Sequence, residues 1–163
     1  MDQACRVSVA SPCDAAAIAG IYNQGIRSRK ATFETALRTD EDIRTWFENG
    51  SVIVGAYRGK ELAGYAAIFE YRPRACYAGV GDFSIYVDDR HQGRGVGGLI
   101  MDELIPRATE YGYWKLLSRI FPENVACRSL LGRVGFREVG VYEKHAKLDG
   151  QWRDVVIVER VLA

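Results

Sequence analysis

A glycine-rich run, Gln92-Gly93-Arg94-Gly95-Val96-Gly97, constrains this 163-residue chain more than any other stretch. It lies between an apolar segment that ends near Val87 and a helix expected from Gly97. Glycine has no Cβ atom, so backbone N–H groups at a helix N-terminus can approach phosphate oxygens, and the positive end of the helix dipole favours the same anion. Arg90 and Arg94 add positive charge. The run therefore predicts a pyrophosphate-binding loop between a strand and a helix.

The same glycines allow two other interpretations. Gly93, Gly95 and Gly98 satisfy the G-x-G-x-x-G pattern of dinucleotide-binding folds, but that pattern directly follows its strand and precedes an acidic residue by about 20 positions. Here residues 88–92 intervene, and residues 115–118 contain no carboxylate. A P-loop is excluded because no Lys-Ser or Lys-Thr follows the glycines. A glycine turn that only caps an ordinary helix stays open as an alternative.

Size and composition fit one globular domain over residues 1–163, with 48% hydrophobic and 26% charged residues. A net charge of +1 gives no reason to expect a nucleic acid or a membrane surface as partner. No apolar run approaches the roughly 18 residues of a membrane span. The four cysteines form no C-x-x-C pair. We therefore expect reduced thiols, a cytoplasmic location and no metal.

Hydrophobic periodicity and turn residues predict alternating strands and helices. Ser11 and Pro12 suit a helix start, Thr39 suits the cap of a second helix, and Asp149-Gly150 suits a type I′ hairpin turn. Strands are expected at residues 6–10, 51–57, 62–69, 79–87, 116–120, 136–148 and 151–161. Helices are expected at residues 12–29, from 40 onward, at 97–111 and at 124–134.

A second motif follows the glycine run. Asn124 opens an expected helix, which is followed by Gly135-Phe136. In this order the two motifs resemble the GNAT superfamily of N-acetyltransferases, in which Gln92, Gly95 and Gly97 match the pattern that holds the pyrophosphate of acetyl-CoA. The element order resembles the GNAT fold as well. The resemblance implies an α/β (α+β) fold, with a central mixed sheet of about seven strands flanked by about four helices.

The resemblance also assigns a cosubstrate site for acetyl-CoA. Backbone N–H groups near residues 85–87 would meet the oxyanion, and Cys127 is interpreted as a small buried residue rather than a nucleophile. Leu131 stands where many relatives carry a Tyr that protonates the thiolate, which leaves Tyr142, water or release of the thiolate itself open. The predicted cofactor-binding residues are Ile85, Tyr86, Val87, Gln92, Gly93, Arg94, Gly95, Val96, Gly97, Asn124 and Cys127.

Further segments resemble the phosphinothricin and methionine sulfoximine N-acetyltransferases within the superfamily, among them Ser84-Ile85-Tyr86-Val87 and the segment 149–154. That group places a proposed catalytic Glu four residues before the Tyr, and here the position holds Asp82. An amine must lose a proton before it attacks a thioester, so we predict that Asp82 is the base, acting directly or through water. The alternative is that Asp82 only pairs with a neighbouring Arg.

The expected substrate is a small amine that carries a carboxylate. Arg74 and Tyr77 match an Arg-x-x-Tyr motif of the group, Phe33 and Glu34 match its substrate-side loop, and a guanidinium binds two carboxylate oxygens at once. His145 is interpreted as structural. The resemblance further implies direct acetyl transfer and a homodimer.

Two rival functions stay open at this point. One is an acetyltransferase for a peptide or protein N-terminus. The other is a non-catalytic acyl-CoA sensor, because Asp82 and Leu131 both depart from common catalytic patterns.

Overall fold

The computed structural model of the chain describes residues 4–162. Helices and strands alternate, with three short 3-10 turns between them. The strands are β1 (Arg6–Val9), β2 (Val52–Arg58), β3 (Glu61–Glu70), β4 (Val80–Val87), β5 (Lys115–Ile120), β6 (Arg137–Leu148) and β7 (Gln151–Val161). The helices are α1 (Ala15–Ser28), α2 (Asp40–Glu48), α3 (Val96–Glu110) and α4 (Val125–Arg133), and the 3-10 turns are η1 (Pro12–Asp14), η2 (Ala75–Tyr77) and η3 (Asp89–His91).

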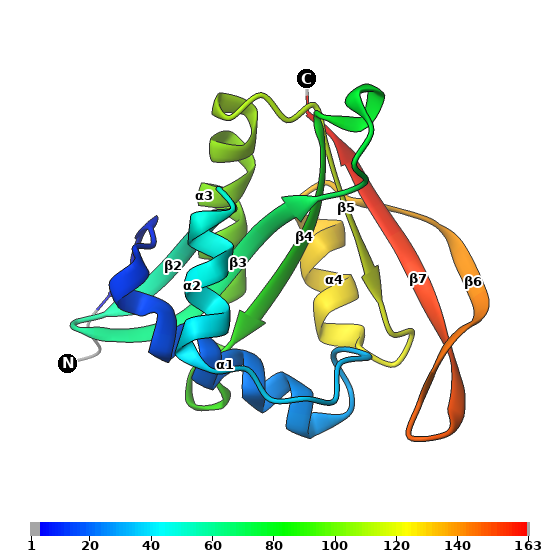
Figure 1. Cartoon of the computed structure of the whole chain (residues 1–163), viewed down its shortest axis with the longest axis horizontal. Helices are drawn as coiled ribbons and strands as arrows, with labels where there is room; N and C mark the ends of the chain where they lie inside the picture. Colours follow the sequence, from blue (N-terminus) through cyan, green and yellow to red (C-terminus); the bar gives the residue numbers. More distant parts are fainter. Residues whose placement is uncertain (1–3, 163) are drawn as a thin grey trace.

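All seven strands form one sheet in the order β1-β2-β3-β4-β5-β7-β6. Every neighbouring pair is antiparallel except β4 and β5, which are parallel, so the sheet is mixed as predicted. Helices α1 and α2 cover one face of the β2–β4 region, and α3 covers the other (Figure 1).

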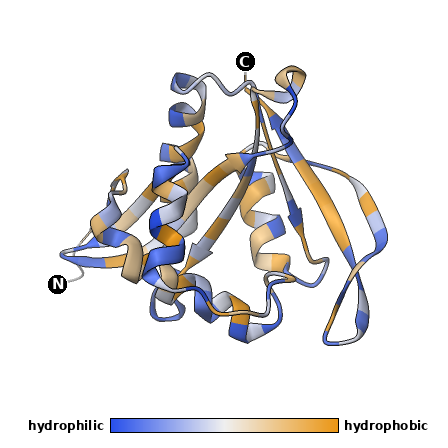
Figure 2. Ribbon diagram, in the orientation of Figure 1, coloured by the Kyte–Doolittle hydropathy of each residue, from blue (hydrophilic) through white to orange (hydrophobic). Residues whose placement is uncertain are grey.

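The alternation of side chains along the central strands explains the two layers. On β2, Val52 and Val54 pack with the α3 side, whereas Ile53 packs with α1 and α2. Because successive strand residues point to opposite faces, strands buried on both sides are apolar throughout. A third, smaller cluster lies under the β6–β7 hairpin, where β7 is strongly hydrophobic along its middle (Figure 2).

Strands β4 and β5 separate soon after they meet. Their ladder covers only three pairs and ends at Asp82 and Leu117. Beyond that point the strands diverge, with α4 visible in the opening (Figure 1). The Ser118 hydroxyl donates to the Phe83 carbonyl at 2.8 Å across the point of separation.

Beyond Asp82, β4 stays paired with β3, but within residues 4–162 its other side has no partner strand. The N–H of Asp88 donates to Ala63 on β3, and the carbonyl of Phe83 faces β5. Since backbone groups alternate sides along a strand, the N–H groups of Ile85 and Val87 point into the opening.

The predicted elements are observed with small shifts at their ends. Thr39 and Asp42 form a reciprocal capping box at α2, and Asp149 and Gly150 both have positive φ angles, of 50° and 78°, as a type I′ turn requires. The first predicted helix is divided into η1 and α1. Residues 1–3 and 163 of the predicted domain lie outside the described residues. Among the described helices, none has the length and apolar character needed to cross a bilayer.

Candidate active site

The glycine run forms a tight loop that ends at the N-terminus of α3. Gly93 and Gly95 have φ angles of 73° and 80°, a left-handed conformation that strains other residues. Gly95 is the N-cap and supplies no side chain, so the first N–H groups of the 15-residue helix have no side-chain cap. A Cβ at Gly97 would lie 2.7 Å from Leu130 Cδ2, so this glycine makes room for α4. The loop is therefore built to present N–H donors to an anion.

A hydrogen-bonded network holds the start of this loop. The buried Asp88 carboxylate accepts from Gln24 on α1 at 3.2 Å and from Arg90 Nε at 3.0 Å. The Gln24 side chain also accepts the N–H of Asp89 at 2.9 Å. Arg90 pairs with Glu61 as well, so the positive charge that the sequence places beside the loop at this position is balanced by two carboxylates.

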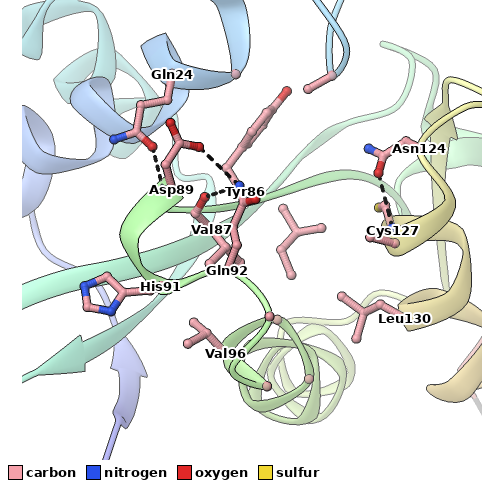
Figure 3. Close-up of a pocket in the computed structure, with 18 of the residues that line it drawn as sticks. Gln24, Tyr86, Val87, Asp89, His91, Gln92, Val96, Asn124, Cys127 and Leu130 are labelled. Atoms are coloured by element: carbon pink, nitrogen blue, oxygen red, sulfur yellow. Dashed lines mark hydrogen bonds between the residues drawn. The ribbon is translucent and has the colours of Figure 1, made fainter. Parts of the chain in front are cut away.

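A cleft of about 400 Å³ opens in front of the loop. Tyr86 and Gln92 lie on one side of it, and Asn124, Cys127 and Leu130 lie on the other (Figure 3). Asn124 caps α4 by accepting the Cys127 N–H at 3.3 Å. All predicted cofactor-binding residues line the cleft except Arg94, which is exposed beside it.

The cleft also holds a residue that sequence reasoning missed. Arg133, in the last turn of α4, is the one Arg or Lys among the described residues that line it. Its place one helix length after Asn124 is the signal that could have identified it.

A small space of about 50 Å³, called the passage below, lies between this cleft and a second cavity of about 420 Å³ and shares lining residues with both. The passage runs through the opening between β4 and β5 and shares Ile85 and Asn124 with the cleft and Ser118 and Arg119 with the cavity. Tyr86 lines all three spaces. The opening thus places a polar cavity directly behind the glycine-loop cleft.

Asp82 lies in this second cavity and forms an ion pair with Arg119 of β5. Burial raises the pKa of the Asp82 carboxyl group, and the charge and hydrogen bond of Arg119 oppose that rise. The pairing with an Arg, which the sequence left as an alternative to a catalytic role, is therefore present. The net direction of the pKa shift nevertheless favours a proton acceptor.

His145 lines the same cavity, although the sequence favoured a structural role. It lies where the β6–β7 pairing is irregular: Tyr142 opposes Val155, and Ala146 opposes Arg153, so β6 contains two extra residues. Such bulges redirect side chains near active sites. Across residues 4–162, no cluster of three or more His, Cys, Asp or Glu side chains is arranged to hold a metal ion.

The predicted substrate-side residues divide into two groups. Phe33 and Glu34 line the cavity, and Phe33 meets Phe121 edge to face at 4.9 Å between ring centroids. Arg74 and Tyr77 lie instead in and beside η2, in the loop between β3 and β4, and neither lines the cavity.

Three other residues bear on the leaving group. Burial raises the pKa of the Cys127 thiol to about 11, so the thiol is protonated at neutral pH. Leu131 is buried in the core and lines the passage. Tyr142 is 53% exposed and lines none of the three spaces, which argues against it as the acid.

Comparison with known proteins agrees with this arrangement. The chain is 32% identical to a phosphinothricin N-acetyltransferase of Alcaligenes faecalis, over 98% of this chain and 83% of the relative. It is 26% identical to an L-methionine sulfoximine/L-methionine sulfone acetyltransferase of Pseudomonas aeruginosa, over 92% and 90% of the two chains. It also superimposes on the crystal structure of a ribosomal-protein-alanine N-acetyltransferase from Brucella melitensis with a TM-score of 0.92, at 27% identity, covering 96% and 99% of the chains.

The family assignment rests on a match to a family profile. The profile of the Acetyltransferase (GNAT) family matches residues 22–136, which run from α1 through the glycine loop to the end of the second motif. With this match and the relatives above, the chain belongs to the GNAT family of acetyltransferases.

Proposed function

We propose that this protein is a single-domain N-acetyltransferase that moves the acetyl group of acetyl-CoA directly to the amino group of a small amino acid or amino-acid analogue. One observation carries the proposal: the glycine-loop cleft and a polar cavity that contains Asp82 lie on the two sides of the β4–β5 divergence and share lining residues with the passage between them. Two substrates bound on the two sides of this passage would meet beside the free N–H groups of β4. The phosphinothricin and methionine sulfoximine enzymes among the relatives support an amino-acid analogue as acceptor.

The cleft suits acetyl-CoA in shape and donors. The N–H groups of the glycine loop and of the first turn of α3 would bind the pyrophosphate, and Gln92 would close the loop over it. Arg133 would meet a further phosphate of the same molecule. Asn124 and Cys127 would line the path of the pantetheine arm toward the passage.

The chemistry follows from the groups around the passage. Asp82 takes a proton from the substrate ammonium group, directly or through water, and the neutral amine attacks the thioester carbonyl carbon. The N–H groups of Ile85 and Val87 stabilise the oxyanion. The added nitrogen then loses its second proton to water, the C–S bond breaks and the N-acetyl product forms. CoA leaves as the thiolate, which takes a proton back from water.

A homodimer is proposed on the family resemblance. A cytoplasmic location is proposed on the reduced state expected for the four thiols. Edge strand β6 carries the exposed side chains of Val139, Val141 and Tyr142, and a second copy would cover them.

The test is the release of free thiol from acetyl-CoA by the purified chain, with mass spectrometry of the products. The acceptor panel holds phosphinothricin, methionine sulfoximine, methionine sulfone, common amino acids, a polyamine and a short peptide with a free N-terminus. We expect turnover with the amino-acid analogues. Asp82→Asn is expected to lower that turnover while acetyl-CoA binding persists.

A second candidate function, acetylation of a peptide N-terminus, is favoured by the similarity to the ribosomal-protein-alanine N-acetyltransferase structure. Turnover with the peptide alone would support it and contradict the small-substrate proposal. Acetyl-CoA binding without turnover on any amine would instead support the sensor function.

A further inference from the structure

Arg119 is the one Arg or Lys among the described residues that line the cavity behind the passage. Its side chain is 39% exposed, and that of its partner Asp82 is 21% exposed. The ion pair therefore faces the cavity rather than the packed core. A guest molecule in this cavity meets both charges.

The divergence of the two strands creates this pair. Asp82 is the last β4 residue in the ladder, opposite Leu117, and Arg119 lies two residues beyond Leu117 on β5. Residues two apart on a strand share a face, so Arg119 reaches back across the opening to Asp82. Among the described residues, Arg119 bonds to the Asp82 carboxylate through Nη2. A guanidinium carries five N–H donors, so capacity for a further anion remains.

We infer that Arg119 is the residue that binds the substrate carboxylate, while Asp82 faces the substrate amino group. This inference rests on the proposed function. An α-amino acid is a zwitterion whose two charged groups are separated by one carbon atom. The neighbouring carboxylate and guanidinium of the pair match these charges with opposite signs. Substrate binding replaces the ion pair between Asp82 and Arg119 with two ion pairs, one from each residue to the substrate. It also places the substrate nitrogen beside Asp82 and the passage.

The rest of the cavity agrees with this orientation. Tyr22, Phe33, Phe69 and Phe121 supply aromatic walls for a side chain. Glu34 is held by Arg38, with 3.0 Å between Oε2 and Nη2. Arg74, the sequence-based candidate for the carboxylate, lies outside the lining. The structure thus moves carboxylate recognition from the η2 loop to β5.

The experiment compares matched acceptors that differ only in the carboxylate. For each amino acid that is turned over, kcat/KM is divided by kcat/KM of its decarboxylated amine and by kcat/KM of its carboxamide. We expect the unsubstituted chain to favour the amino acid by about 10-fold to 100-fold, the range of a charge-assisted bond. Arg119→Gln should reduce this ratio to within a few-fold of unity, mainly through KM of the amino acid, and Arg119→Lys should give an intermediate ratio because it lacks the planar fork. Arg44→Gln, at an exposed position on α2, is the matched control.

Several outcomes would overturn the inference. If Arg119→Gln keeps the ratio, or if Arg74→Gln abolishes it instead, Arg119 does not bind the carboxylate. If the unsubstituted chain turns over all three acceptors equally, this inference fails and the acetyltransferase function stands. Absence of turnover with every amine contradicts the proposed function itself.

A second measurement uses the unsubstituted chain, in case the variants do not fold. The deaminated acid that corresponds to a good substrate should inhibit competitively against the amino acid, because it keeps the group that Arg119 binds. The corresponding amide should inhibit at least several-fold more weakly. Equal inhibition by acid and amide would contradict carboxylate recognition.

Discussion

Asp82 is subject to two opposing effects, because burial raises the pKa of its carboxyl group and Arg119 lowers it. A base must be deprotonated to act, so kcat/KM should rise with pH through the pKa of Asp82. Arg119→Gln removes the lowering effect, and the rising limb should therefore move to higher pH. Measurement of pH–rate profiles for both chains tests this shift.

Two variants distinguish the contribution of Asp82 to the pH–rate profile from that of the other titratable groups near it. Those that line the cavity include Glu34, His145, Tyr22 and Tyr86. Asp82→Asn should lower kcat by about 100-fold or more, the usual contribution of general base catalysis. His145→Gln keeps Asp82 and should keep the rising limb in place. A limb that disappears in the His145 variant and persists in the Asp82 variant would assign the base to His145.

Cys127 provides a second prediction for a single side chain. Its thiol has a pKa raised to about 11, and a protonated thiol is a poor nucleophile. Cys127→Ala should therefore retain kcat within a few-fold. Mass spectrometry of the enzyme quenched during turnover should find no acetyl group on Cys127. An acetylated Cys127 peptide that forms and decays at the rate of turnover would contradict direct transfer.

Among the elements, α1 and the glycine loop are joined through Asp88. The hydrogen bonds from Arg90 and Gln24 lower the pKa of the Asp88 carboxyl group to about 2, and its side chain is only 5% exposed. A lowered pKa stabilises the fold above the unfolded-state pKa, near 3.8, and the contribution is lost as the pH falls toward 2. At about 1.4 kcal/mol per pKa unit, discounted for the exposed Arg90, the carboxylate contributes about 1 to 2 kcal/mol at neutral pH.

Asp88→Asn should lower the free energy of unfolding by that amount at pH 7, and the difference from the unsubstituted chain should shrink at pH 3.

Because Asp88 and Gln24 fix the start of the loop, Gln24→Ala should raise KM for acetyl-CoA several-fold and leave KM for the amine nearly unchanged. Urea titration and steady-state kinetics measure the two effects. A stability difference that grows toward pH 3 would have the wrong sign for this linkage.

The element order was predictable because its signals are local. Thr39 and Asp42 cap α2, and Asp149-Gly150 closes the β6–β7 hairpin, each within four residues of sequence. The glycine-loop cleft was predictable for the same reason, since most of the N–H donors expected there come from one continuous loop. The second cavity was not, because Asp82 and Arg119 are 37 residues apart and meet only where β4 and β5 diverge.

His145 shows a second limit of sequence reasoning. An alternating pattern assigns a strand residue to one face or the other, but the two extra residues of β6 interrupt the ladder between Tyr142 and Ala146, and the pattern does not place the residues within that irregularity. The position of a bulge depends on the partner strand, which the local sequence does not contain. The polar run Glu143-Lys144-His145, which follows the apolar residues Val141 and Tyr142, was the available signal.

At the scale of the whole molecule, the exposed edge of the sheet leads to the last prediction. Val141 is 54% exposed on β6, and the β6–β7 hairpin also supplies His145 and Val155 to the cavity wall. A second copy seated on this edge would brace that wall, whereas the glycine-loop cleft is lined by residues of α1, β4, α3 and α4. Val141→Glu should therefore shift the chain from dimer to monomer in sedimentation, raise KM for the amine several-fold and leave acetyl-CoA binding unchanged.

Leu37→Glu, at a residue 48% exposed between α1 and α2, is the matched control and should stay dimeric. An unsubstituted chain that sediments at 18.2 kDa at every concentration would refute the dimer. A monomeric Val141 variant with unchanged KM would mean that each substrate site is complete within one chain.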